Sequence, residues 1–235
     1  MEINPVLVIV IPVYNEEDNI AALLGDWKDL LDSIHAPYKI ILIDDGSTDN
    51  SLSLLKTLQA KNPAFDVYTQ PNAGHGPAIL KGYALSLDAE WVFQIDADHQ
   101  LDTDTFKMLW EHRESHDLLI AERREINASL TRKWISRASA LIVHMLYGTR
   151  VSDVNSPYRL MRARLLMTAL EKMPPDCFAP NVLLTAWFIR KKTRIFTTTV
   201  DMRPKSISRK STLSRHIFLG AWRAAWQTLL FRIKL

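Results

Sequence analysis

The chain has 235 residues, of which 47% are hydrophobic and 23% charged, and its formal net charge is +3. This composition is ordinary for a globular protein with one sizeable core, or at most two small ones. The single cysteine, Cys177, excludes an intrachain disulfide, so the fold does not depend on an oxidising compartment. Because no run of about 18 apolar residues is uninterrupted, a membrane-spanning helix is not expected.

The first half of the chain alternates between strand-like and helix-like segments. Short apolar runs are followed by stretches whose apolar residues recur at helical spacing. This alternation predicts an α/β fold with a mostly parallel, Rossmann-like sheet flanked by helices. The expected strands are Val6–Val13, Tyr38–Ile43, Phe65–Thr69 and Trp91–Ile95, and the expected helices span residues 16–31, 51–59 and 77–87.

Acidic residues follow three of these strands. Glu16 comes after the first strand and Asp45 after the second, while Asp96 and Asp98 follow the fourth. In a parallel sheet, ligands gather at the carboxyl ends of the strands. We therefore expect these side chains to meet at one edge of the sheet.

The segment Asp96-Ala97-Asp98 carries two carboxylates two positions apart. Such side chains project to the same side of an extended chain, and they repel each other unless a cation lies between them. Mg²⁺ and Mn²⁺ commonly use one or two carboxylates together with phosphate oxygens. A solvated turn at the strand end is the alternative. The chain lacks both G-x-G-x-x-G after the first strand and G-x-x-x-x-G-K-[ST], which argues against a nicotinamide dehydrogenase and a phosphate-loop ATPase.

The second half is more helical and less regular. We expect one domain over residues 1–212, followed by a C-terminal helix over residues 213–235. Helices are predicted near Thr103–Ser115, Leu130–Tyr147, Met161–Lys172 and Asn181–Arg190, with strands near Asp117–Ala121 and Arg194–Val200.

The C-terminal segment is basic and amphipathic. No acidic residue follows Asp201, whereas eight lysines and arginines do. This charge predicts an anionic partner, and the helical spacing of the apolar residues favours the surface of a membrane. Docking of the helix on the protein's own core is the alternative. Nucleic acid is not expected, because no recognition motif accompanies the basic residues. The apolar positions are Phe218, Trp222, Ala225, Trp226, Leu229 and Ile233.

Four ordered motifs carry a resemblance to a known family. They are residues 10–17 (VIPVYNEE), 43–49 (IDDGSTD), 72–76 (NAGHG) and 96–100 (DADHQ). With these motifs the chain resembles family 2 glycosyltransferases over roughly its first 210 residues. The similarity is greatest to the dolichol-phosphate mannosyltransferase and polyprenyl-phosphate glycosyltransferase branch, and it implies a GT-A fold.

The resemblance also implies a donor site for a nucleotide-sugar and a divalent cation, Mg²⁺ or Mn²⁺. Arg123 corresponds to an arginine that pairs with phosphate, although a solvated pair with Arg124 is the alternative. The implied nucleotide-sugar ligands are Pro12, Tyr14, Glu16, Asp45, Asp96, Ala97, Asp98 and Arg123, and the implied metal ligands are Asp96, Asp98 and Gln100.

For the acceptor, residues 153–159 (DVNSPYR) resemble the D-x-x-S-G-x-R element of polyprenyl-phosphate transferases, with Pro157 in place of glycine. The implied catalytic residues are Asp98, Asp153 and Arg159, and the implied acceptor and diphosphate ligands are Arg159, Arg203, Arg209 and Lys210.

These residues predict an inverting glycosyltransferase that moves a sugar from a UDP- or GDP-sugar to a polyprenyl or dolichyl phosphate. We expect it to lie at the cytoplasmic face of a membrane as a peripheral protein, either alone or with a membrane-embedded partner. Two alternatives stay open: a glycan or small-molecule hydroxyl as acceptor, and a non-catalytic nucleotide-sugar-binding protein.

Overall fold

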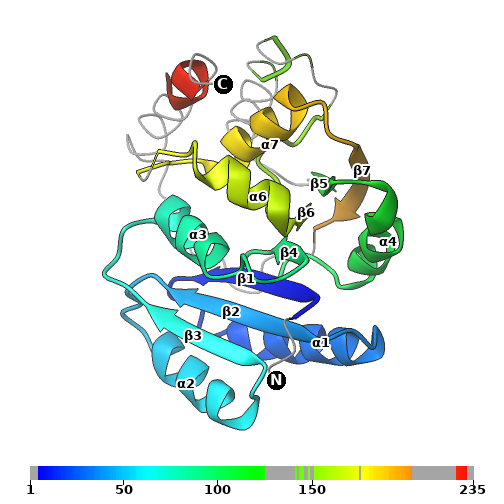
Figure 1. Ribbon diagram of the computed structural model, residues 1–235. Helices are drawn as coiled ribbons and strands as arrows, with labels where there is room; N and C mark the ends of the chain where they lie inside the picture. The colour runs from blue at the N-terminus through cyan, green and yellow to red at the C-terminus, as the bar shows by residue number, and fades with distance from the viewer. Residues whose placement is uncertain are drawn as a thin grey trace.

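The computed structural model describes residues 5–124, 141, 143–145, 148, 151–174, 176–202 and 226–231. Within these residues a seven-stranded sheet has the order β3-β2-β1-β4-β6-β5-β7 (Figure 1). The strands β3, β2, β1 and β4 are parallel, β6 is antiparallel to both of its neighbours, and β5 and β7 are parallel. The strands are β1 Leu7–Val13, β2 Tyr38–Asp44, β3 Phe65–Thr69, β4 Trp91–Gln94, β5 Leu118–Arg124, β6 Arg159–Arg162 and β7 Ile195–Asp201.

Helices cover both faces of the sheet, because its central strands are apolar on both sides. Residues of β1 alternate between two hydrophobic clusters: Leu7 and Ile9 belong to one, and Val8 and Val10 to the other. The first cluster includes residues of α1 and α4, and the second residues of α3, α6 and α7 (Figure 1). The helices are α1 Ile20–Ser33, α2 Ser51–Lys61, α3 His75–Ala84, α4 Asp104–His112, α6 Ala163–Leu170 and α7 Pro180–Arg190, with a 3-10 turn η1 at Arg113–Ser115.

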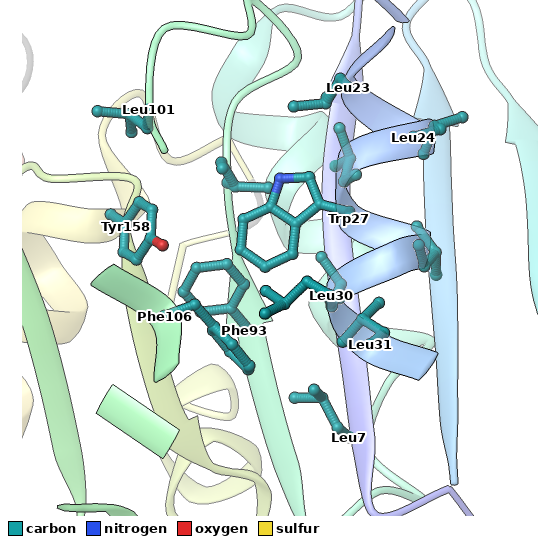
Figure 2. Packing of buried hydrophobic residues seen from close by; sticks show 14 of the residues in the cluster. Leu7, Leu23, Leu24, Trp27, Leu30, Leu31, Phe93, Leu101, Phe106 and Tyr158 are labelled. Carbon is teal, nitrogen blue, oxygen red and sulfur yellow. The ribbon is translucent and has the colours of Figure 1, made fainter. Parts of the chain in front are cut away.

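Aromatic rings join the two halves of the chain beneath one face of the sheet. Trp27 of α1 packs against Phe93 and Phe106, with ring centroids 5.2 and 5.4 Å away (Figure 2). Tyr158, next to β6, meets Phe93 edge-on at 4.9 Å and donates a hydrogen bond to the carbonyl oxygen of Asp102 at 2.8 Å. This packing fixes the start of β6 beside the segment that follows β4.

The structure confirms the predicted α/β fold with its mostly parallel sheet. It corrects one element: the helix expected from Met161 starts at Ala163, since Arg159–Arg162 forms strand β6. This four-residue strand lacks a strand-like pattern of its own, and pairing with β4 and β5 determines its conformation.

Two other predicted helices are only partly covered. Most of the segment Leu130–Tyr147 lies outside the described residues, and of residues 213–235 the structure describes residues 226–231, which are helical. In the described ranges, no helix combines the length and apolar character needed to cross a membrane.

Candidate active site

A cavity of about 410 Å³ opens at the carboxyl ends of β1, β2 and β4. Its walls bring together most of the residues that the sequence predicts for a donor site. The predicted residues in the wall are Pro12, Tyr14, Glu16, Asp45, Asp96, Ala97 and Asp98. Arg123, Gln100, Asp153 and Arg159 are not among the lining residues that the structure describes.

Hydrogen bonds tie the loop after β1 to the loop after β2. Asn15, which has a φ of 55°, donates its backbone N–H to the hydroxyl of Ser47 at 3.0 Å. Its side-chain oxygen accepts the backbone N–H of Thr48 at 2.7 Å. The backbone N–H of Glu16 donates to the hydroxyl of Ser51 at 2.8 Å. The residues that follow β2 therefore hold the Glu16 side of the cavity in place.

Asp45 is buried and organises the loop between β3 and α3. Its carboxylate accepts hydrogen bonds from the Gln70 side chain at 2.7 Å and from the backbone N–H groups of Ala73 and Gly74, both at 2.9 Å. Gly74 itself lines the cavity. Asp45 thus acts as a loop anchor, and charge-assisted bonds of this kind are stronger than neutral ones.

Asp96 has an unsatisfied oxygen at the cavity wall. Its Oδ1 is buried and has no hydrogen-bond partner among the described residues. The Nε2 atom of His75 lies 3.5 Å from this oxygen, and 29% of the Asp96 side chain is exposed. A buried carboxylate oxygen without a partner is costly. The Asp96 carboxylate, with Asp98 two residues on in the same wall, therefore fits a hard divalent cation.

The loop after Asp98 is held on its outer side. His99 adopts a φ of 53°, and its Nε2 lies 2.9 Å from Oδ2 of Asp26 in α1. Gln100 is buried, and its backbone N–H donates to Oδ1 of Asp98 at 3.4 Å. In the part of the chain that the structure describes, no three His, Cys, Asp or Glu residues cluster as a protein-only metal cage. A site with two carboxylates instead suits Mg²⁺ or Mn²⁺, which share their coordination with phosphate oxygens.

Arg123 and Asp153 form an ion pair with each other. Nε of Arg123 lies 2.8 Å from Oδ2 of Asp153, and a second nitrogen lies 3.1 Å from Oδ1. The two side chains are only 15% and 10% exposed. This bidentate pair joins the end of β5 to the loop before β6.

Arg159, the expected ligand of an acceptor phosphate, is also directed into the protein in this structure. The side chain is fully buried and donates to the carbonyl oxygens of Ser156, Asn181 and Val154 at 2.8 to 3.1 Å. Burial lowers the pKa of Arg159 to about 10. Because its donors are directed to protein acceptors, we assign Arg159 a structural role in holding the loop before β6 against α7.

Several lining residues lie outside the predicted set. Val13, Asn72, Gly74, His75 and Ala78 complete the cavity wall. Three of them lie in the NAGHG motif of residues 72–76, so the motif itself indicated this side of the site. The predicted phosphate ligands Arg203, Arg209 and Lys210 lie outside the described residues.

Comparison with solved structures supports the fold. The crystal structure of glucosyl-3-phosphoglycerate synthase from Mycobacterium tuberculosis with Mn²⁺, UDP-glucose and phosphoglyceric acid matches with a TM-score of 0.68 at 17% identity, covering 97% of this chain and 80% of that one. Residues 1–349 of TarS from S. aureus with UDP-GlcNAc match with a TM-score of 0.62 at 17% identity, covering 95% and 66%. These likenesses show the expected GT-A fold.

Sequence comparison identifies the family. Undecaprenyl-phosphate 4-deoxy-4-formamido-L-arabinose transferases from Serratia proteamaculans and Yersinia enterocolitica are each 30% identical to the chain over 191 residues. The match covers 80% of this chain and 57% of each relative, so the chain spans little more than half of their length. The family profile of glycosyl transferase family 2 matches residues 8–179, which is most of the chain. The chain therefore belongs to glycosyl transferase family 2.

Proposed function

We propose that the protein is an inverting glycosyltransferase that moves a sugar from a UDP- or GDP-sugar to a polyprenyl phosphate. The observation that carries this proposal is the unsatisfied Oδ1 of Asp96 in a cavity that Asp98 also lines. A divalent cation supplies the positive charge that offsets the repulsion between these two carboxylates, and a nucleoside diphosphate supplies the phosphate oxygens that complete its coordination. The names of the curated relatives, which are undecaprenyl-phosphate sugar transferases, support the choice of acceptor.

In this proposal Asp96 and Asp98 hold a divalent cation, with Gln100 as a candidate third ligand. The cation, when bound, neutralises the negative charge that develops on the leaving diphosphate. Tyr14, with 48% of its surface exposed at the cavity wall, offers a face to the nucleoside, and Glu16 offers acceptor oxygens to its hydroxyls or ring N–H groups. The complexes of the two structural neighbours with UDP-sugars support UDP-sugars as the first donors to test.

With a phosphate acceptor, the protein does not need to supply a general base. A phosphate monoester has a second pKa near 6 and is largely dianionic at pH 7, so it can attack the anomeric carbon without a general base. This fits Asp153, whose carboxylate is already engaged by Arg123. We therefore give Asp153 and Arg123 the role of supporting the acceptor side of the site.

The acceptor lipid places the reaction at a membrane surface, and we propose peripheral association with its cytoplasmic face. Trp226 and Leu229, two of the predicted apolar positions, are 50% and 42% exposed. The eight basic and no acidic residues after Asp201 suit an anionic surface. Arg203, Arg209 and Lys210 are the proposed ligands of the acceptor phosphate. The proposal also allows for a membrane-embedded partner.

Turnover tests the proposal directly. The purified chain is incubated with Mn²⁺ or Mg²⁺, UDP- or GDP-sugars and a polyprenyl phosphate, and the lipid product is analysed. We expect an acid-labile glycosyl phosphate whose anomeric configuration is opposite to that of the donor, and no product in EDTA. Absence of turnover with every nucleotide-sugar and polyprenyl phosphate would refute the proposal.

A hydroxyl acceptor is the second candidate, and the burial of Arg159 favours it. This arginine was expected to bind the acceptor phosphate, yet its donors are used within the protein. With a hydroxyl acceptor, the product would carry an alkali-stable glycosidic bond. A glycosyl phosphate as the only product would exclude this candidate.

A further inference from the structure

Residues 226–231 form a C-terminal helical segment. The side chain of Gln227 in this segment contacts the loop before α7. Its Oε1 accepts the backbone N–H of Phe178 at 3.0 Å, and its Nε2 donates to the carbonyl oxygen of Asp176 at 3.3 Å. One amide thus holds the backbone on both sides of Cys177, which is fully buried. The two contacts fix residues 176–178 relative to the helical segment.

The same loop presses against the wall of the donor cavity. A Cβ added to Gly76 would lie 2.2 Å from the carbonyl oxygen of Cys177 and 2.8 Å from that of Phe178. Gly76 lies in the first turn of α3, between His75 and Ala78, which both line the cavity. His75 in turn lies 3.5 Å from Asp96. Backbone contact this close leaves little room for one segment to move without the other.

Hydrophobic packing also connects the helical segment to α3. Phe231 of the C-terminal helical segment, Cys177 and Ala78 belong to one buried cluster. Thr228 and Phe231 face inward with 2% exposure each, whereas the other side of the segment is open to solvent. Four large apolar side chains form an exposed surface here, each with between 41% and 50% of its area open to solvent. They are Phe178 of the loop before α7 and Trp226, Leu229 and Leu230 of the helical segment.

We propose that Gln227 is a positioning residue that couples this exposed apolar surface to the donor cavity. This inference rests on the proposed function. When the surface of Phe178, Trp226, Leu229 and Leu230 docks on an anionic membrane, the helical segment is held still. Gln227 then holds residues 176–178, and these hold the first turn of α3 and His75 in the geometry that receives the nucleotide. Coupling between two sites is reciprocal, so nucleotide binding strengthens membrane binding by the same factor.

The experiment measures the affinity of the intact chain for UDP and for GDP in the presence of Mn²⁺. Each titration is repeated with vesicles of phosphatidylcholine and phosphatidylglycerol, and with neutral phosphatidylcholine vesicles. Gln227→Ala removes both amide contacts, and Gln227→Glu keeps an acceptor for the Phe178 N–H but loses the donor. Trp226→Ala is a variant of the proposed docking surface, because it truncates an exposed residue of that surface and leaves the Gln227 amide in place. Met167→Ala, at an apolar position of α6 that is 46% exposed and lies outside this surface, is the control.

For the wild type, anionic vesicles should tighten nucleotide binding by about fivefold or more, and the nucleotide should tighten vesicle binding by the same factor. In Gln227→Ala, vesicles should no longer tighten nucleotide binding, and the nucleotide should bind about fivefold more weakly than to the wild type without vesicles. The affinities of Gln227→Glu should lie between those of Gln227→Ala and the wild type. Trp226→Ala should weaken vesicle binding, and Met167→Ala should change neither the vesicle affinity nor the nucleotide affinity.

Two other outcomes separate this inference from the proposed function. If the wild type binds UDP or GDP with Mn²⁺ but Gln227→Ala and Gln227→Glu match it with and without vesicles, the coupling is wrong and the donor site stands. If the wild type binds neither nucleotide, the proposed function fails, and the inference fails with it.

Discussion

Asp98 follows β4 and lies in the wall of a cavity, whereas Arg159 begins the neighbouring strand β6 and lies entirely inside the protein. On the β1–β4 side, parallel strands end together, and their acidic residues face a shared space. On the β6 side, Arg159 is enclosed by carbonyl groups, and Arg123 is paired with Asp153.

This contrast distinguishes residues that can take part in the reaction from residues that stabilise the fold. Charges that remain at the surface of a cavity can exchange protein contacts for a ligand, while charges already engaged inside the protein chiefly maintain its shape. We therefore expect substitutions on the β4 side to affect turnover and substitutions on the β6 side to affect stability.

Asp98→Ala should produce the largest effect on activity. Loss of one of two carboxylates weakens the cation site and removes several kcal/mol of transition-state stabilisation, which corresponds to about a thousandfold loss of turnover. The thermal midpoint of the apo protein should stay near that of the wild type. Asp104→Ala, at a carboxylate that is 85% exposed on α4, is the control. Unchanged donor turnover in Asp98→Ala would show that the reaction does not depend on this carboxylate, and no turnover in the wild type would favour a binding-only role for the chain.

Arg159→Met should lower the free energy of unfolding by about 3 kcal/mol, because it removes three hydrogen bonds to buried carbonyl groups. The carbonyl oxygens of Val154 and Asn181 keep a bond from the Thr185 hydroxyl, whereas that of Ser156 loses its side-chain donor. Urea denaturation measures this change, and Arg164→Met, at an exposed position of α6, should have little effect. A variant that is as stable as the wild type but inactive would instead assign Arg159 a direct role in the reaction.

Asp45→Asn should weaken nucleotide binding by about tenfold. An amide can offer only one acceptor oxygen, so at least one of the donors from Gln70, Ala73 and Gly74 loses its partner. Calorimetric titration with UDP or GDP and Mn²⁺ measures the loss, with Asp18→Asn, at an exposed position, as control. Equal affinities of the two variants would show that the loop needs no anchor.

Asp117→Asn should have the smallest effect, and that effect should depend on pH. Hydrogen bonds from Arg194 lower the pKa of Asp117 from its ordinary value of 3.8. The depressed pKa in the folded state stabilises the protein above pH 3.8, and the contribution is lost as the pH falls through the folded-state pKa.

The variant should therefore be less stable by about 1 kcal/mol at pH 7, and it should match the wild type at pH values below the folded-state pKa. Asp201→Asn removes a more exposed pair with Arg124, whose side chains are 64% and 61% exposed, and should change little. A loss of stability that does not vary with pH would contradict the assignment.

The sequence predicted the β1–β4 side well because local pattern and tertiary structure agree there. Strands β1, β2 and β4 are mostly apolar, and parallel pairing brings their ends to one edge. This placed Glu16, Asp45, Asp96 and Asp98 together in advance, and all four line the cavity.

The β6 side could not be predicted in the same way. Strand β6 has only four residues, and its conformation depends on pairing with β4 and β5. The burial of Arg159 likewise depends on Asn181 of α7, which is 22 residues away in the chain. A motif can indicate that such an arginine matters, but whether it points outward or inward is decided by packing between distant segments.

The cation site between Asp96 and Asp98 is the central claim, and its most direct test is a thermal-shift titration of UDP and GDP with and without Mn²⁺. Binding to the folded state raises the midpoint according to occupancy. We predict that the midpoint of the wild type rises strongly only when Mn²⁺ and one of the two nucleotides are present together, and that Asp98→Ala loses this rise. An equal rise without Mn²⁺, or in Asp98→Ala, would contradict the account.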